Sequence, residues 1–200
     1  MRGLMELLER VTERRPWSDL RTTAADLEAL DALRAKLREL LRAREPGKRP
    51  RASGSTVLFT GADRAGKSVA AQVLGSALAL EVYRIDLRAA LSAYGAETER
   101  SLDRLLTSAV AAPVVLLFDE ADALFGKRSS TEPTDDRYRA GPIAAVDRCL
   151  SRQSGLAIIA CDHADDLDPA FLKRMGERIA FPVPDPRSRA ARWEKQLPTP

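Results

Sequence analysis

Apolar positions in the first part of the chain follow a helical period. Leucines recur there at three- and four-residue steps with arginine and glutamate between them, as Leu20, Leu27, Leu30, Leu33, Leu37, Leu40 and Leu41. This spacing puts them on one side of a helix. We expect an amphipathic helix over residues 18–45, preceded by a shorter helix over residues 4–14. Such a stripe usually packs on its own domain or on a neighbouring helix, and a dedicated partner-binding surface is the alternative.

Proline, glycine and serine interrupt this pattern, and the rest of the chain alternates between two kinds of segment. We interpret residues 46–54 as a linker between a helical segment, residues 1–45, and a core, residues 55–200. The expected strands are 55–60, 81–86, 113–118, 156–161 and 178–183, and the expected helices lie near 67–80, 97–110, 141–152 and 169–175. Strands alternating with helices predict a three-layer α/β fold with a five-stranded parallel sheet, whose ligand binds at the carboxyl ends of the strands.

A glycine-bounded run follows the first expected strand and opens the next expected helix. It reads Gly61, Ala62, Asp63, Arg64, Ala65, Gly66, Lys67 and Ser68 and fits the pattern G-x-x-x-x-G-K-[ST]. Backbone N–H groups of such a loop surround a phosphate at the positive end of a helix. The pattern predicts that Lys67 reaches the β- and γ-phosphates of a nucleotide and that the Ser68 hydroxyl binds Mg²⁺. An ordinary strand, turn and helix with a coincidental Gly-Lys-Ser is the alternative.

Two carboxylates end the expected strand at 113–118. That strand is a continuous apolar run, as in a strand buried on both faces, and Asp119 and Glu120 follow it directly. Beside a phosphate-binding loop, one carboxylate can hold Mg²⁺ and a second can polarise the attacking water. We assign the metal to Asp119 and the water to Glu120. Acidic residues also end strands where the chain returns to solvent, but the two motifs in this order favour a nucleotide site.

Composition and charge narrow the class of protein. The 32 basic and 29 acidic residues give a net charge of +3, which argues against nucleic acid as the main partner. Cys149 and Cys161 have neither metal-ligand spacing nor a disulfide framework. The sequence shows no signal peptide and no apolar stretch of membrane length. We expect a cytoplasmic protein of bacterial origin with no membrane partner.

Several sequence blocks, taken together, resemble AAA+ ATPases, a superfamily of P-loop NTPases. They are residues 61–68, 116–128, 165–174 and 181–185. Within the superfamily, residues 82–87 and 136–138 and the block around Asp119 look most like bacterial ATPases of phage-tail-like contractile injection systems. The resemblance runs from about Ser55 to Trp193. It implies ATP and Mg²⁺ as ligands, a ring-like homo-oligomer, and a client protein whose complexes are assembled or remodelled at the expense of ATP.

The resemblance also assigns roles to single residues. Asp162 stands where the family usually has Asn, a sensor near the γ-phosphate. An ionised carboxylate cannot donate to a phosphate oxygen, so we expect slow hydrolysis unless proximity to Glu120 raises the proton affinity of Asp162. A cap on the following turn is the other interpretation of Asp162. Arg174 matches the arginine finger that completes a neighbouring subunit's site, with Arg178 as second candidate, whereas a surface arginine at a helix end is the alternative.

Three further features bear on function. Tyr94 occupies the place of the family's aromatic pore loop, although Gly95 follows where an aliphatic residue is usual. Arg64 stands where most family loops have glycine, which constrains the loop if its backbone needs a positive φ. The sequence stops where the family's small helical lid would begin, so we expect a core without a lid.

The sequence favours an ATPase in which Glu120, Asp162 and Arg174 act in catalysis. The alternative is a non-hydrolysing, nucleotide-responsive interaction protein that works through its leucine-striped helix, and Asp162, Arg64 and the missing lid favour it. A DNA-associated member of the superfamily ranks third, because the core shows no helix-turn-helix and no basic stripe.

Overall fold

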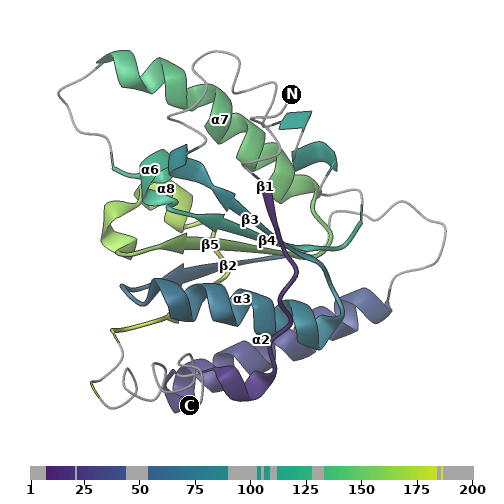
Figure 1. Cartoon of the computed structure of the whole chain (residues 1–200). Coiled ribbons are helices and arrows are strands. Elements are labelled where there is room, and N and C mark those ends of the chain that lie inside the picture. Colours follow the sequence, from purple (N-terminus) through teal and green to yellow (C-terminus); the bar gives the residue numbers. More distant parts are fainter. Residues whose placement is uncertain are drawn as a thin grey trace, which may run out of the picture.

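A six-stranded sheet forms the centre of the computed structural model, with the strand order β1-β3-β4-β5-β2-β6 (Figure 1). The structure describes residues 8–20, 22–43, 54–89, 103–104, 106–108, 112–127, 133–183 and 186, without the side chains of 133–140. Neighbouring strands are parallel throughout, except that β1 runs antiparallel to β3. The α/β fold predicted from the sequence is therefore confirmed, with an additional strand at one edge.

The elements follow one another in a regular alternation beyond β1. The strands are β1 (Leu8–Val11), β2 (Ser55–Thr60), β3 (Val82–Asp86), β4 (Val115–Asp119), β5 (Leu156–Cys161) and β6 (Glu177–Ala180). The helices are α2 (Ala24–Arg42), α3 (Arg64–Leu78), α6 (Asp122–Phe125), α7 (Pro133–Arg152) and α8 (Pro169–Leu172), with 3-10 turns η1 (Trp17–Asp19) and η3 (Ala164–Asp166). Most of the helix expected at 97–110, and nearly all of the expected linker, lie outside the described residues. No described helix has both the length and the apolar character needed to cross a bilayer.

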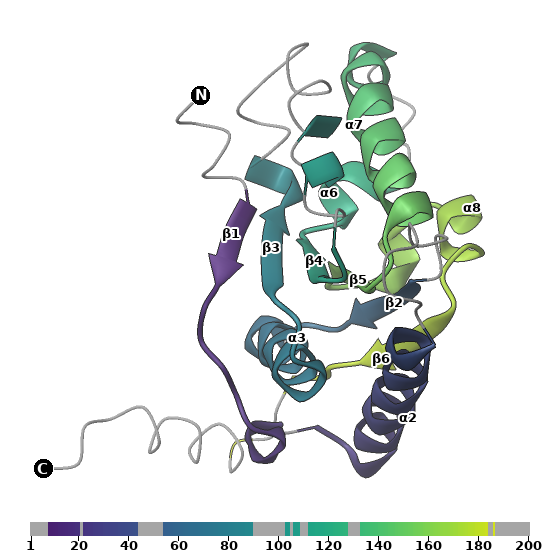
Figure 2. The ribbon, with the colours of Figure 1, turned by 90° about the vertical axis from the view of Figure 1, so that its right-hand side faces the viewer.

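Burial explains why the parallel strands were predictable. All six residues of β5 are buried, and so are the first four of β4, because helices cover both faces of the sheet. Helices α6, α7 and α8 pack on one face, and α2 and α3 pack on the other (Figures 1 and 2). A parallel strand covered on both faces is apolar along its whole length, and that is the pattern the sequence carries.

The N-terminal segment corrects one prediction, since Leu8–Val11 forms the strand β1 and not part of a helix. It pairs with β3 in the register Leu8 to Ile85 and Val11 to Val82. Leu8 joins the apolar cluster on the α7 face, and Val11 joins the cluster on the α3 face. This is the two-sided arrangement of a strand. The open edge of β3 supplies backbone hydrogen-bond partners, and this tertiary context overrides a weak local helical pattern.

Helix α2 carries the leucine stripe and begins later than expected. Thr23 caps it, because its hydroxyl accepts a hydrogen bond from the backbone N–H of Asp26 at 3.2 Å. Leu30, Leu33 and Leu37 are buried in the cluster formed with α3 and β6. The centre of the stripe therefore packs in the chain's own core, and its side chains are not exposed to a partner.

Truncation of this stripe tests its role as core. We expect Leu33→Ala to lower the free energy of unfolding by about 2–5 kcal/mol, the usual range for a fully buried leucine that leaves a cavity. Urea unfolding of the purified chain gives the value. Glu39→Ala, on the exposed side of the same helix, is the matched control and should change stability by less than about 0.5 kcal/mol. If Leu33→Ala is as stable as the control, the leucine stripe is not part of the core, and the partner-binding alternative is favoured.

Candidate functional site

The loop between β2 and α3 turns sharply at Gly61. Gly61 has a φ of 114°, and a Cβ on it would lie 2.2 Å from the carbonyl oxygen of Phe181. Asp63 caps α3, because its carboxylate accepts a hydrogen bond from Gly66 N at 3.0 Å. Helix α3 therefore begins at Arg64, earlier than predicted. Arg64 has a helical backbone and needs no positive φ, so the constraint considered from the sequence does not arise.

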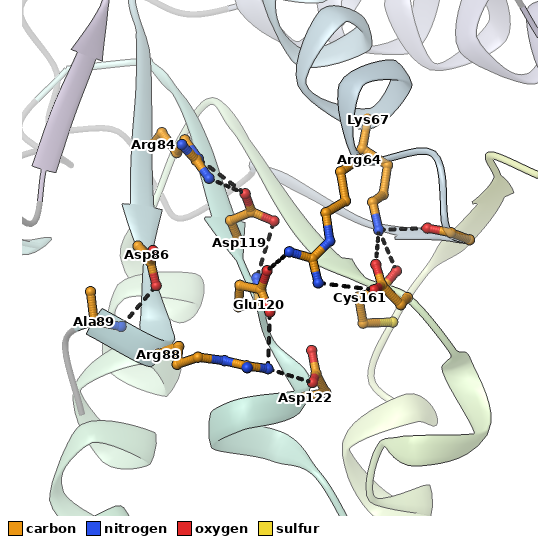
Figure 3. A network of polar contacts seen from close by, with 12 residues as sticks. Arg64, Lys67, Arg84, Asp86, Arg88, Ala89, Asp119, Glu120, Asp122 and Cys161 are labelled. Atoms are coloured by element: carbon orange, nitrogen blue, oxygen red, sulfur yellow. Dashed lines mark hydrogen bonds and ion pairs between the residues drawn. The ribbon is translucent and has the colours of Figure 1, made fainter. Parts of the chain in front are cut away.

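Lys67 lies on the first turn of α3 and is only 2% exposed. Its Nζ donates to the carbonyl oxygens of Gly61 and Cys161, both at 2.7 Å, and to Oδ1 of Asp162 at 3.0 Å (Figure 3). An ammonium group has three donors, so every donor of Lys67 has a partner within the chain. The lysine of the glycine-bounded run is thus held at the carboxyl end of β5, with its charge facing a carboxylate.

Asp119 ends β4 and is bonded to an arginine of the neighbouring strand. Arg84 of β3 donates to Oδ2 of Asp119 through Nε at 3.0 Å and through a terminal nitrogen at 2.7 Å. The other oxygen of Asp119 accepts the backbone N–H of Glu120 at 3.1 Å. Both carboxylate oxygens therefore have partners, and the side chain is fixed at the strand end (Figure 3).

Glu120 has an unusual backbone and two cationic neighbours. Its φ is 56°, a left-handed conformation that costs a non-glycine residue roughly 1–2 kcal/mol. Oε1 lies 2.6 Å from Arg64 and Oε2 lies 3.0 Å from Arg88, and the side chain is 13% exposed. Figure 3 shows Glu120 between the two arginines, which approach from α3 and from the end of β3. The sharp turn after β4 is what points this carboxylate toward the phosphate-binding loop.

Asp162 follows β5 and lies between two cations of the same loop. Lys67 bonds to its Oδ1 at 3.0 Å, and Arg64 bonds to its Oδ2 at 3.1 Å. Burial by itself would raise the pKa of Asp162, but the hydrogen bonds and charges of Lys67 and Arg64 outweigh it, and the pKa is lowered. The raised proton affinity considered from the sequence is therefore wrong, because the nearest charges are positive. Asp162 is an ionised carboxylate at neutral pH.

Ser68 and Asp119 are the two expected metal ligands. The described residues contain no group of three or more His, Cys, Asp or Glu side chains that could hold a metal ion. A hydroxyl and one carboxylate fit Mg²⁺, which is usually held by one or two protein ligands together with water and phosphate oxygens. Ser68 and Arg84, the partner of Asp119, both line a cavity of about 290 Å³, and Asp119 itself is not among the lining residues. Both Arg84 bonds fall on Oδ2 of Asp119, so Oδ1, which among the described residues accepts only the backbone N–H of Glu120, keeps acceptor capacity toward a metal-bound water.

Both cysteines are free and buried. Burial raises the pKa of the Cys149 thiol to about 12 and that of the Cys161 thiol to about 11. Neither forms a thiolate at neutral pH, and the thiolate is the nucleophilic form. Cys161 contributes to the site through its backbone carbonyl only.

One described candidate from the sequence, Arg174, is not part of this cluster. Arg174 follows α8, is bonded to Asp147 of α7 at 3.0 Å, and shares a cavity with Ser55 and Glu177, which begin β2 and β6. It therefore lies at the amino ends of these strands, opposite the phosphate-binding loop. Tyr94 lies outside the described residues.

Sequence reasoning missed the arginines that hold the two carboxylates. Arg84 lies in the segment at 82–87, which was noted for its family resemblance and as an expected strand, and Arg88 directly follows that segment. The usable signal was Arg84 itself, a charged residue inside an apolar strand next to the strand that ends in Asp119. A half-buried arginine at such a position needs a carboxylate partner, and the register pairs Asp86 with Asp119.

Comparison with known proteins bears on the same region. Residues 57–183 match the model of the ATPase family associated with various cellular activities (AAA). An uncharacterized AAA family ATPase of Sinorhizobium fredii, y4kL, is 27% identical over 180 residues, which are 90% of this chain and 54% of that protein. The ATP-dependent zinc metalloprotease FtsH 3 of Sphaerobacter thermophilus is 26% identical over 180 residues, 85% of this chain and 37% of that protein. The chain thus spans about half the length of the first relative and less of the second.

Solved structures match almost the whole chain. The AAA domain of FIGL-1 in complex with ADP superposes with a TM-score of 0.73 at 19% identity, covering 97% of this chain and 66% of that one. At this level of identity the likeness concerns the fold alone.

Proposed function

The chain belongs to the AAA family of ATPases, and from this premise we propose that it binds Mg·ATP at the loop after β2 and hydrolyses it. One observation carries the proposal most directly. The lysine of the loop, the two carboxylates at the end of β4 and the sensor-position residue after β5 form one cluster, linked through Arg64 and the backbone N–H of Glu120, at the carboxyl end of the sheet. Ligands of open parallel sheets bind at this end.

The roles of the residues follow from charge and position. Lys67 is the buried cation that meets the β- and γ-phosphates, at the N-terminus of a helix whose dipole also favours anions. Glu120 orients and polarises the attacking water after at least one of its two arginines releases it. Ser68 and Asp119 hold Mg²⁺, which neutralises charge developing on the phosphate oxygens.

The proposed biological role is assembly or remodelling of a protein complex in the bacterial cytoplasm. A bacterial relative and FtsH 3 support the class of activity, and a proteasome-associated ATPase of a Nocardioides species is 28% identical over 164 residues, 72% of this chain and 28% of that protein. The segments at 82–87 and 136–138 favour an ATPase of a phage-tail-like contractile injection system. The client is a protein, and the active form is a ring-like homo-oligomer.

We propose an oligomer because Arg174 lies at the amino ends of β2 and β6, whereas Lys67 of the same chain lies at the carboxyl end of the sheet. An arginine finger supplied by a neighbouring subunit stabilises charge on the transferred phosphoryl group. We expect Arg174→Ala and Glu120→Gln chains each to be inactive alone and to recover turnover when mixed, because some interfaces then pair an intact finger with an intact Glu120. Co-assembly is verified by co-purification of one untagged variant with the other, affinity-tagged variant. Mixed oligomers that stay inactive would make Arg174 a surface residue held by Asp147.

A second candidate function has an observation in its favour. Both oxygens of Glu120 are bonded to arginines, and Asp162 is ionised beside the proposed phosphate position, so a nucleotide-responsive protein without turnover fits the same site. Mg·ATP turnover of the purified chain, measured across concentrations that span assembly, separates the two. A specific activity that rises with concentration supports the ATPase. Nucleotide binding without turnover at every concentration supports the alternative.

A further inference from the structure

Two residues that depart from the family pattern contact each other. Arg64 replaces a usual glycine of the loop, and Asp162 replaces a usual asparagine after β5, and their side chains are bonded at 3.1 Å across 98 positions of sequence. We propose that Arg64 is a positioning residue that retains the Asp162 carboxylate when Lys67 turns from Asp162 to the phosphates of the nucleotide. This inference rests on the proposed function.

The partners of Lys67 show why such a residue is needed. Two of its three acceptors are neutral backbone carbonyls, and the third is the charged Oδ1 of Asp162. A phosphate oxygen that enters the site competes most directly with this carboxylate for the ammonium group. Once released, Asp162 would face the phosphates as an unpaired negative charge, which repels them and is costly at a half-buried position.

The geometry of Arg64 suits it to this task. Its guanidinium bonds to Oδ2, the oxygen that Lys67 leaves unused, so the carboxylate can keep one cationic partner while it loses the other. The Arg64 side chain is 60% exposed and long, whereas Lys67 is almost fully buried. The arginine can therefore follow the carboxylate outward as phosphates enter.

Charge leads to the same conclusion. Lys67, Arg64 and Asp162 together carry a net positive charge of one. The arrangement usual in the family, a lysine with glycine at position 64 and an uncharged residue at position 162, carries the same net charge. Arg64 thus restores to the loop the charge that Asp162 removes. The same guanidinium contacts Glu120 at 2.6 Å, so the cation that holds Asp162 also holds the residue assigned to the water.

A double-mutant cycle on nucleotide affinity tests the pairing. Calorimetry gives Kd for Mg·ATP and Mg·ADP with the parent chain, Arg64→Gln, Asp162→Asn and the double variant. We expect Arg64→Gln to weaken Mg·ATP binding about tenfold or more in the parent background, the scale of losing one charge-assisted contact. In the Asp162→Asn background the same change should alter Kd by less than about twofold, since residue 162 is then uncharged and Glu120 keeps Arg88 as a partner. Arg64→Lys should retain much of the affinity.

Arg88→Gln is the matched control. It removes a cation from the other oxygen of Glu120, so its effect on Kd should be the same with and without Asp162→Asn. Circular dichroism on heating shows whether each variant is folded, and the exposure of Arg64 makes loss of folding a remote cause of weaker binding.

Each other outcome overturns the inference in a distinct way. Equal losses of nucleotide affinity from Arg64→Gln in both backgrounds would indicate that Arg64 binds phosphate directly. Tighter nucleotide binding by Arg64→Gln would indicate that the Arg64 side chain blocks the site. An unchanged Kd for Arg64→Gln in the parent background would show that Arg64 has no role in nucleotide binding. A parent chain that binds neither nucleotide would refute the proposed function itself, whereas a parent that binds with an uncoupled pair refutes only the role of Arg64.

Discussion

Replacing Glu120 with glutamine is expected to lower ATP turnover at least ~100-fold while ATP remains bound, the usual scale for losing a general base. Glutamine keeps the size of the side chain but not the negative charge that polarises water. The change also removes the charge that holds Arg64 and Arg88, so nucleotide affinity is expected to stay equal or to rise. Steady-state phosphate release and calorimetry on the same preparation measure the two quantities.

Asp122→Asn is the control for this experiment. Asp122 contacts Arg88 at 3.4 Å from the helix that follows Glu120, so the variant removes a neighbouring carboxylate without touching the proposed base. Turnover of this control should stay within about twofold of the parent. If Glu120→Gln hydrolyses ATP at the parent's rate, the water has been assigned to the wrong residue, and the non-hydrolysing alternative loses its main structural argument as well.

Lys67→Ala is expected to weaken Mg·ATP binding on the order of 100-fold, because it removes a charged donor from the phosphates. The loss has a second component in this chain, since Asp162 would then lack its buried partner and its charge would face the nucleotide. Binding of Mg·ADP should weaken less than binding of Mg·ATP if Lys67 reaches the γ-phosphate. Fluorescence titration with a labelled nucleotide measures both affinities.

Lys36→Ala removes the same charge from the exposed side of α2 and is the control. Its ion pair with Glu177 is exposed, so we expect almost no change in affinity and little in stability. Thermal unfolding of Lys67→Ala shows whether the variant is folded, because two carbonyl oxygens lose a buried partner in it. Equal affinities for ATP in a folded Lys67→Ala and in the parent would exclude the loop as the nucleotide site.

The sequence could predict those parts of the molecule whose causes are local. Strands such as β5 are apolar throughout because both of their faces are covered, and the glycines of the loop are required by a positive φ at Gly61 and by the close approach of Asp63 to Gly66. Asp119 and Glu120 could be assigned because they end such a strand. The apolar run, the glycines and the two carboxylates each lie within a few residues of the strand, turn or strand end that they predict.

Features that depend on distant partners could not be predicted in this way. Residues 8–11 form a strand only because the edge of β3 lies beside them, and nothing in their own sequence shows that edge. The sequence predicted an ionised Asp162, but it also allowed a raised proton affinity beside Glu120, because it could not show that Arg64 and Lys67 bond to this carboxylate. The bonds of Arg84 to Asp119 and of Arg88 to Glu120 likewise depend on which strands become neighbours.

The order of the strands in the sheet has a consequence for how the chain is made. β2 lies between β5 and β6, which come latest in sequence among the described strands. The segment that carries the phosphate-binding loop is therefore synthesised early but has no strand neighbour until residues 156–180 have emerged. Lys67 likewise cannot form its bonds to the carbonyl of Cys161 and the carboxylate of Asp162 until those residues have been synthesised. Pairings between segments so far apart in sequence form slowly, because a long loop must close first. A nascent chain arrested before β5 would expose both edges of an apolar strand, which makes this stage of synthesis the one most in need of a chaperone.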